Sequence, residues 1–442
     1  MENAINASYL FIYALIFAIL FLFLYAKAHS LFAPATLWNV CWMVLFLAGG
    51  VLGQNYLYDA SSTFLLFALA ASFNLVPLLV SKDLKETPKL TQTQVETVIL
   101  MPAWVIAVTA MVGFLGALQL SVQLGTPLIS ASSISRALEA SSDNAALIYR
   151  GEVVRSTFGT VSYALMQFGF AALGVRMRAR PNRWTWFVLL LSLISAASWT
   201  IVTTQRSYFL VSFLWLVAGY IAAAVAVGNE KVSWKLVAWG MSAVAALTLF
   251  VVGARAIRVA GANAQLNESS WSSASLWAAG YIPTFSSWHS SGGGTVIYPL
   301  RLLSGVLALT GTGVDAGTDA DNEEFTYIGA GQLSNASTMM RAVVLGSGDV
   351  AAFLVVVLFG AVSIAIYRGA QQRRVFAIAA YIGVVATIIW SVNAWHFSNA
   401  NRVLAQVVLL VAFGLSVALM RRRERLAQRR LRRRPTARVR AE

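Results

Sequence analysis

The sequence has very little cysteine and little charge, and each shortage excludes a class of protein. Among 442 residues, Cys41 is the only cysteine, so neither an intrachain disulfide nor a cysteine-based metal site can form. Charged residues make up 12% of the chain and hydrophobic residues 58%. A soluble fold could not keep so much apolar surface out of water. The composition therefore indicates a membrane protein.

Several familiar sequence patterns are also missing. Short segments of alternating hydrophobicity, the signature of a transmembrane β-barrel, are absent. No Walker-type phosphate loop occurs, so use of cytoplasmic ATP is not indicated. The first residues, MENAINASYLF, contain no basic region, and the first apolar run is expected to be a retained helix and not a cleaved signal peptide.

Long apolar runs recur along the chain instead. Most are close to the ~20 residues that a helix needs to cross a bilayer, and a helix satisfies its own backbone hydrogen bonds. We expect an all-α polytopic integral membrane protein with about eleven transmembrane helices, forming a single domain over residues 1–420 with a basic tail over 421–442. The expected spans are 7–26, 33–52, 61–81, 98–121, 157–176, 184–203, 207–227, 236–257, 342–367, 375–393 and 400–420.

Two long polar connections separate these spans, at about 122–156 and 258–341. The second is rich in Trp, Tyr and Gly and contains the semi-apolar stretch VIYPLRLLSGVLALTG, for which a re-entrant or interfacial helix is one interpretation. It also contains a short acidic motif at Asp319 and Asp321. A divalent cation is one candidate for this motif, but we favour a solvated acidic turn and expect no metal and no cofactor.

The distribution of basic residues predicts the orientation of the chain. Eleven arginines follow the last apolar run, within 421–440. The positive-inside rule places this tail in the cytoplasm, and both long loops and the N-terminus then lie outside. The tail is expected to anchor the protein and to contact membrane lipids. We reject nucleic-acid binding as the explanation of the net charge of +15.

On the outer side every basic residue is an arginine, whereas every lysine falls inside. Arginine keeps its charge, and its planar fork binds phosphate oxygens bidentately. Charges at membrane depth are costly and mark binding sites or pathways. The alternative is that these arginines extend to the interface or pair with outer acids. The outer-side arginines taken together favour a lipid-linked pyrophosphate as the ligand. They are Arg136, Arg150, Arg155, Arg206, Arg255, Arg258, Arg301, Arg341 and Arg402.

Two histidines lie on or near the outer face, His289 in SSWHSS and His396 in NAWHFSNANR. A neutral histidine can take a proton from an attacking sugar hydroxyl. An ordinary hydrogen-bonding role is the alternative for each. The sequence shows no recognisable Ser-His-Asp spacing.

Three stretches, TTQRSYFL, AAGYIPTFSSW and SNASTMMRAVVLGSGDVAAFLVVVLFG, resemble motifs of the Wzy-type O-antigen polymerases, which join oligosaccharide repeat units. TTQRSYFL resembles the small-polar-Arg-Ser motif of that family, and AAGYIPTFSSW resembles its Tyr-to-Phe stretch in the large outer loop. SNASTMMRAVVLGSGDVAAFLVVVLFG resembles the region leading into a late helix. In this third stretch Asn335, Thr338, Gly348 and Gly360 match, whereas Gly346 replaces the family aspartate and Asp349 lies nearby.

The resemblance implies a metal-independent glycosyltransferase of the GT-C type. Such an enzyme polymerises undecaprenyl-pyrophosphate-linked oligosaccharides at the outer face of the bacterial inner membrane, alongside a chain-length regulator protein. Arg206 is the first choice for the donor pyrophosphate. The expected catalytic residues are Arg206, Arg255, Arg258, His289 and His396. The expected substrate-binding residues are Arg341, Arg402, Tyr281, Arg301, Asn335 and Thr338.

Three alternatives stay open. An O-antigen ligase would use the same donor with a different acceptor. A metal-dependent GT-C transferase would need Asp319 and Asp321, but that class carries its acidic motif in the first outer loop, where this chain has only Asp59. A transporter or flippase for a lipid-linked sugar would show paired broken helices in an internal repeat, and no repeat is visible.

Overall fold

The computed structural model describes residues 6–79, 91–125, 153, 156–203, 207–230, 275–276, 278–293, 298–310, 326–329, 331–336 and 338–433, without the side chains of residues 92 and 427–433. In this part of the chain, eight helices are long and apolar enough to cross a membrane. The expected all-α polytopic membrane fold is confirmed. The long helices are α1 (Leu10–Ala28), α2 (Pro34–Leu52), α6 (Ala103–Gln123), α9 (Thr157–Ala179), α10 (Arg183–Thr203), α11 (Ser207–Val227), α17 (Met339–Gln371) and α19 (Ala400–Arg433).

Two shorter apolar helices, α3 (Ala60–Ser72) and α18 (Val375–Trp390), occupy two further expected spans. The expected span 236–257 lies outside the described residues, so the count of eleven stays a prediction. The remaining described helical elements are short: η1 (Ala7–Tyr9), α4 (Leu75–Leu79), α5 (Gln92–Ile99), α14 (Tyr281–Trp288), η2 (His289–Gly293), η3 (Arg301–Leu303), α15 (Ser304–Leu309) and η4 (His396–Ser398).

The span expected over 61–81 is interrupted between α3 and α4. Pro77 has no N–H to donate to the carbonyl of Phe73, so a continuous helix would lose a hydrogen bond there. At the break, the Asn74 side chain bonds reciprocally to that of Asn39 in α2, at 2.9 and 3.0 Å. This buried amide pair fixes the interruption against the neighbouring helix.

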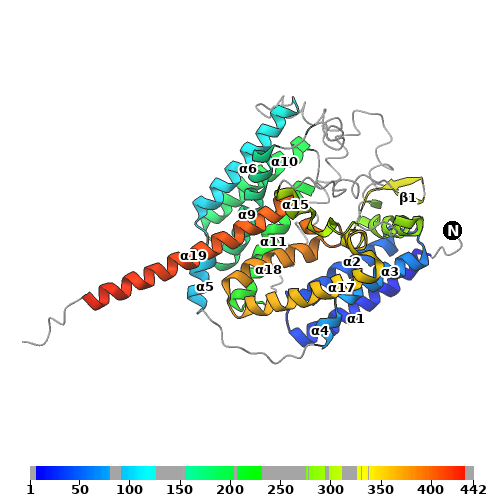
Figure 1. Ribbon diagram of the computed structural model, residues 1–442, viewed down its shortest axis with the longest axis horizontal. Coiled ribbons are helices and arrows are strands. Elements are labelled where there is room, and N and C mark those ends of the chain that lie inside the picture. The colour runs from blue at the N-terminus through cyan, green and yellow to red at the C-terminus, as the bar shows by residue number, and fades with distance from the viewer. Residues whose placement is uncertain are drawn as a thin grey trace, which may run out of the picture.

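The helices form two groups that α18 joins (Figure 1). Helices α6, α9, α10 and α11 lie together, α1, α2, α3 and α17 lie on the other side, and α18 packs against both α11 and α2. Close packing of α9 on α11 depends on glycine. A Cβ atom at Gly174 would lie 2.0 Å from the carbonyl oxygen of Leu216, so only glycine allows this approach, as is common between membrane helices.

Among the described residues, most of the irregular structure lies at one end of the bundle, and we call it the hairpin end. It comprises the antiparallel hairpin of β1 (Thr326–Gly329) and β2 (Gln332–Ser334), the elements α14, η3, α15 and η4, and the first turns of α17 and α19. Helix α19 runs from this end to the opposite side of the molecule (Figure 1). The semi-apolar stretch expected as a re-entrant or interfacial helix forms only η3 and α15 among its described residues, which is too short to span a bilayer.

Candidate functional site

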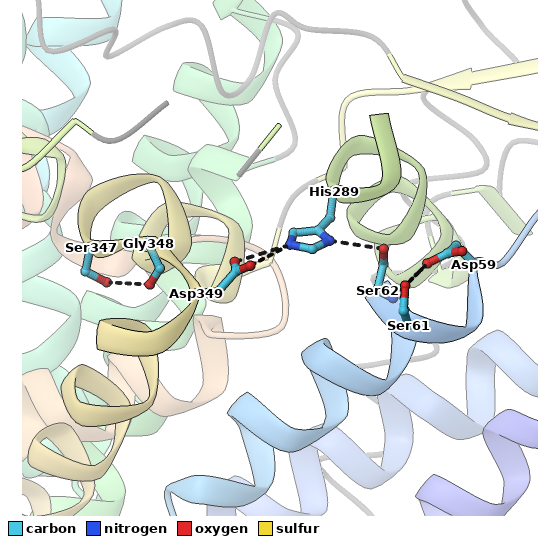
Figure 2. Close-up of polar contacts among 7 residues, drawn as sticks. All are labelled: Asp59, Ser61, Ser62, His289, Ser347, Gly348 and Asp349. Carbon is cyan, nitrogen blue, oxygen red and sulfur yellow. Dashed lines mark hydrogen bonds and ion pairs between the residues drawn. The ribbon is translucent and has the colours of Figure 1, made fainter. Parts of the chain in front are cut away.

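A chain of three polar side chains crosses the hairpin end. His289 follows α14 directly, and its Nε2 lies 3.2 Å from both carboxylate oxygens of Asp349 in α17. Its Nδ1 lies 3.1 Å from Oγ of Ser62 in α3. Figure 2 shows the imidazole between these two partners. The ring of Phe285, one turn earlier in α14, stacks on the imidazole with 5.9 Å between centroids. Three elements therefore fix the orientation of His289.

Asp349 reaches His289 because α17 is broken at Gly348. The backbone of Gly348 has φ 76° and ψ 165°, a conformation that is essentially restricted to glycine. The first segment of α17, before Gly348, is mostly buried, whereas the segment after it presents Val350 and Leu354 on its surface. Asp349 is thus the first residue of α17 after the break, and its side chain points to His289 in η2.

Asp59 lies beside this chain but has another function. Its Oδ1 accepts hydrogen bonds from Ser62 N at 2.8 Å and from Ser61 Oγ at 2.7 Å, so it caps α3. Its backbone N–H donates to Ser286 Oγ in α14. Burial opposes ionisation, but the hydrogen bonds and the nearby His289 outweigh it and lower the pKa of Asp59. Asp59 therefore joins α3 to α14 as a charged cap.

Arg341 is buried in the first turn of α17, with 1% of its surface exposed. Its guanidinium carbon lies 4.9 Å from the ring centroid of Trp288, the residue before His289. Such cation–π contacts are stronger where water is excluded. The start of α17 is tied to the end of α18 by a hydrogen bond from Met339 N to Ser391 O at 2.8 Å.

Arg402 occupies the equivalent place at the start of α19. It is 8% exposed, its guanidinium carbon lies 5.2 Å from the ring centroid of Trp390, and its Nη1 donates to the carbonyl of His396 at 3.2 Å. Trp390 immediately precedes Ser391, which binds the start of α17. The two arginine–tryptophan pairs are therefore organised around one junction of α17, α18 and α19.

His396 is completely buried in this junction. Its ring packs against Trp215 with 5.4 Å between centroids, and neither ring nitrogen has a hydrogen-bond partner among the described residues. Burial, reinforced by Arg402, lowers the pKa of His396 well below its ordinary value. His396 is therefore neutral near pH 7.

Arg301 is the third buried arginine of the hairpin end, with 5% exposed. It begins η3, which packs against both α17 and η4. A Cβ atom at Gly346 would lie 3.6 Å from that of Arg301. Tyr298 N donates to Leu345 O at 2.7 Å and holds this segment on α17. Three arginines thus come from η3, α17 and α19 to one end of the bundle.

The other expected site residues divide into two sets. Tyr281 is buried at the start of α14, where burial raises the pKa of its hydroxyl. Thr338 is the buried N-cap residue of α17, and Asn335 is half-buried between β2 and α17. The remaining candidates lie outside the described residues: Arg136, Arg150, Arg155, Arg206, Arg255, Arg258, Asp319 and Asp321. The described residues contain no group of three His, Cys, Asp or Glu side chains that could hold a metal ion.

Sequence reasoning found His289 but missed its partners. Ser62, His289 and Asp349 are separated by 227 and 60 residues, so no spacing rule would join them. The one local sign of this arrangement is Gly348, because a glycine within a segment otherwise typical of a membrane helix can mark a break in that helix. Comparison with known proteins adds nothing to this geometry. No protein-family model, curated protein or solved structure matches the chain.

Proposed function

We propose that this protein is a membrane glycosyltransferase that polymerises undecaprenyl-pyrophosphate-linked oligosaccharide units at the outer face of the bacterial inner membrane. In this proposal the hairpin end and the N-terminus face outward, the arginine-rich tail is cytoplasmic, and a chain-length regulator protein is a partner. The growing chain is transferred from its lipid carrier to the next lipid-linked unit.

One observation carries the proposal: Arg301, Arg341 and Arg402 are buried at one end of a membrane bundle. Guanidinium groups gathered at one end of the bundle favour an anionic ligand, and a pyrophosphate supplies several negative charges in a compact group. Arg341 and Arg402 lie over tryptophan rings, which support each guanidinium at its face. The N–H donors of a guanidinium point along its plane, where bidentate binding of phosphate oxygens occurs.

The chemistry follows from this charge distribution. In glycosyl transfer from a lipid pyrophosphate, negative charge accumulates on the leaving group as the bond to the sugar breaks. Arginines already oriented in a site with little water stabilise that charge without further reorganisation. The polyprenyl chain of the donor would lie along the apolar helices, while the sugars extend toward α14 and the hairpin.

The proposal is tested by product length. The purified protein receives the lipid-linked oligosaccharide of its host in detergent, and the glycans are separated on a gel with and without a chelator. We expect a ladder of products that resists the chelator and disappears in Arg402→Ala, with Arg180→Ala as the control. Arg180 is an exposed arginine at the other end of the bundle, 3.6 Å from Glu96 in α5.

Each alternative predicts a different result. A ladder that disappears with chelator would indicate a metal-dependent transferase. If the wild-type protein yields no product longer than the starting unit, polymerisation is contradicted. Product formed only after a separate glycan acceptor is added would then indicate a ligase. Movement of the lipid across reconstituted vesicles without any new bond would indicate a transporter.

A further inference from the structure

The exposure of the three side chains in Figure 2 increases along the chain that they form. Ser62 is 1% exposed, the side chain of His289 is 20% exposed, and that of Asp349 is 44% exposed. Ser62 is therefore the least accessible of the three. Asp349 is the most exposed of them, and its carboxylate keeps lone pairs beyond those that face His289.

The partners of His289 define which ring nitrogen carries hydrogen in the neutral form. A carboxylate can only accept, so Nε2 carries the hydrogen and donates it to Asp349. Nδ1 then accepts, and Ser62 Oγ is the donor. The chain of hydrogen bonds runs in one direction, from Ser62 through His289 to Asp349. It holds the carboxylate in one orientation at the end of the chain.

We propose that Asp349 is the general base of the transferase, and that His289 and Ser62 are positioning residues that orient it; this inference rests on the function proposed above. The hydroxyl oxygen of the acceptor sugar attacks the anomeric carbon of the donor, and its proton passes to the Asp349 carboxylate. The bond between the anomeric carbon and the pyrophosphate oxygen breaks, and its electron pair leaves with the lipid pyrophosphate. No further reactant is needed.

The position of Asp349 relative to the buried arginines agrees with this role. Arg341 lies on the same helix, before the break at Gly348, and contacts Trp288. Trp288 is joined directly to His289, which binds Asp349. The proton acceptor and one phosphate-binding arginine are therefore connected through a single dipeptide. A transferase needs this arrangement, because the attacking hydroxyl and the leaving pyrophosphate meet at one carbon atom.

Asp59 is the other described acid at the hairpin end, and it is less suited to the role. Its Oδ1 is occupied by the cap of α3 and by Ser61. Its lowered pKa also makes it a weaker base than an ordinary carboxylate. Asp59 instead offers a matched control, since asparagine caps helices as well as aspartate does.

The experiment compares Asp349→Asn with Asp59→Asn in the ladder assay, and measures donor binding separately by protection against thermal unfolding. Asp349→Asn keeps the shape of the side chain and an oxygen acceptor for His289 Nε2. We expect its rate of polymerisation to fall by about 100-fold to 10,000-fold, as for loss of a general base, with donor binding retained. Asp59→Asn should keep the wild-type rate.

The positioning residues give a second readout. Ser62→Ala removes the donor to Nδ1 and frees the imidazole to change tautomer. We expect a smaller loss of rate, with the acid limb of the pH–rate profile displaced, whereas a purely structural role would lower the rate equally at every pH. An unchanged profile in Ser62→Ala would contradict the positioning role.

Two outcomes would overturn the assignment of Asp349 while leaving the polymerase intact. One is a wild-type protein that forms a ladder together with an Asp349→Asn variant that forms it equally fast. The other is an Asp349→Asn variant that loses donor binding along with turnover, which would make Asp349 a structural residue. A wild-type protein that forms no ladder would overturn the proposed function as well.

Discussion

At the scale of single residues, the hairpin end combines permanent positive charge with a histidine that stays neutral. Arg341 and Arg402 keep their charge at any physiological pH, whereas burial beside Arg402 keeps His396 uncharged. A histidine with so low a pKa is a weak base, and it has no exposed surface. His396 is therefore better suited to supporting Arg402 than to accepting a proton from substrate.

Replacement of either stacked arginine by lysine separates the role of charge from the role of shape. Arg341→Lys and Arg402→Lys keep the positive charge but lose the planar fork. We expect each to weaken binding of the lipid pyrophosphate by about 10-fold to 100-fold, the size of a charge-assisted hydrogen bond. Competition by undecaprenyl pyrophosphate would measure this. Arg180→Lys is the control, and equal affinities in all three variants would exclude bidentate binding.

At the scale of elements, two glycines perform different tasks. Gly348 supplies a backbone conformation that breaks α17 and points Asp349 toward His289. Gly174 supplies empty space, because the backbone of α11 occupies the place where a side chain would project. The first glycine affects geometry at the candidate site, and the second affects the stability of the bundle.

Gly348→Ala should damage activity more than folding. A side chain at φ 76° costs about 1 to 3 kcal/mol, and the chain can relieve this strain by straightening α17, which moves Asp349 away from His289. We expect the polymerisation rate to fall about 10-fold or more while the protein still purifies as a folded species. Gly228→Ala is the control, since Gly228 also has a positive φ, 75°, and an added Cβ there would meet nothing within 4 Å. Equal activity in both variants would contradict this role.

Gly174→Ala should damage folding instead. The added methyl would lie 2.0 Å from Leu216 O and 2.8 Å from Tyr220 N, and backbone atoms cannot move aside as a side chain can. Overpacking of this kind costs about 1 to 3 kcal/mol. Thermal unfolding in detergent should show a Tm lowered by several degrees. Gly414→Ala meets only the Phe376 ring, at 3.3 Å, and should keep the wild-type Tm.

At the scale of the whole molecule, the two ends of the bundle differ in charge and in structure. The hairpin end holds the buried arginines and the strands, whereas α19 runs to the far side (Figure 1) and exposes Arg421, Arg422, Arg423 and Arg425 along its later part. The positive-inside rule predicts that the arginine-rich end is cytoplasmic. The single native cysteine makes this orientation simple to test.

Two engineered cysteines, each in a Cys41→Ala background, would report the orientation. Tyr327→Cys lies in the hairpin, where the native side chain is 51% exposed, and Arg423→Cys lies on the exposed part of α19. A maleimide that cannot cross membranes should label Tyr327→Cys in intact cells, and Arg423→Cys only after the cells are permeabilised. Labelling of Arg423→Cys in intact cells would reverse the topology.

The sequence predicted the membrane helices well because their signal is local. Hydrophobic length alone located α1, α2 and α11 to within a few residues. The interruption before Asn74 and the break at Gly348 were missed although Pro77 and Gly348 mark them locally, because hydrophobic length does not reveal a break inside an apolar run. At the site, the sequence singled out Arg341, Arg402 and His289, and the structure places all three at the hairpin end; their chemical roles stay predictions. It could not predict that Asp349 and Ser62 meet His289, because that requires the tertiary arrangement of α3, α14 and α17.

Helix α19 has a mechanical consequence. Its 34 residues extend about 51 Å at ~1.5 Å per residue, well beyond the ~30 Å of a hydrocarbon core. One rigid rod therefore bears Arg402 near its first turn and the arginine cluster near its last. Any tilt of this rod swings its two ends in opposite directions. A tilt that changed the distance between the arginine-rich end and anionic headgroups would therefore also move Arg402 relative to Trp390.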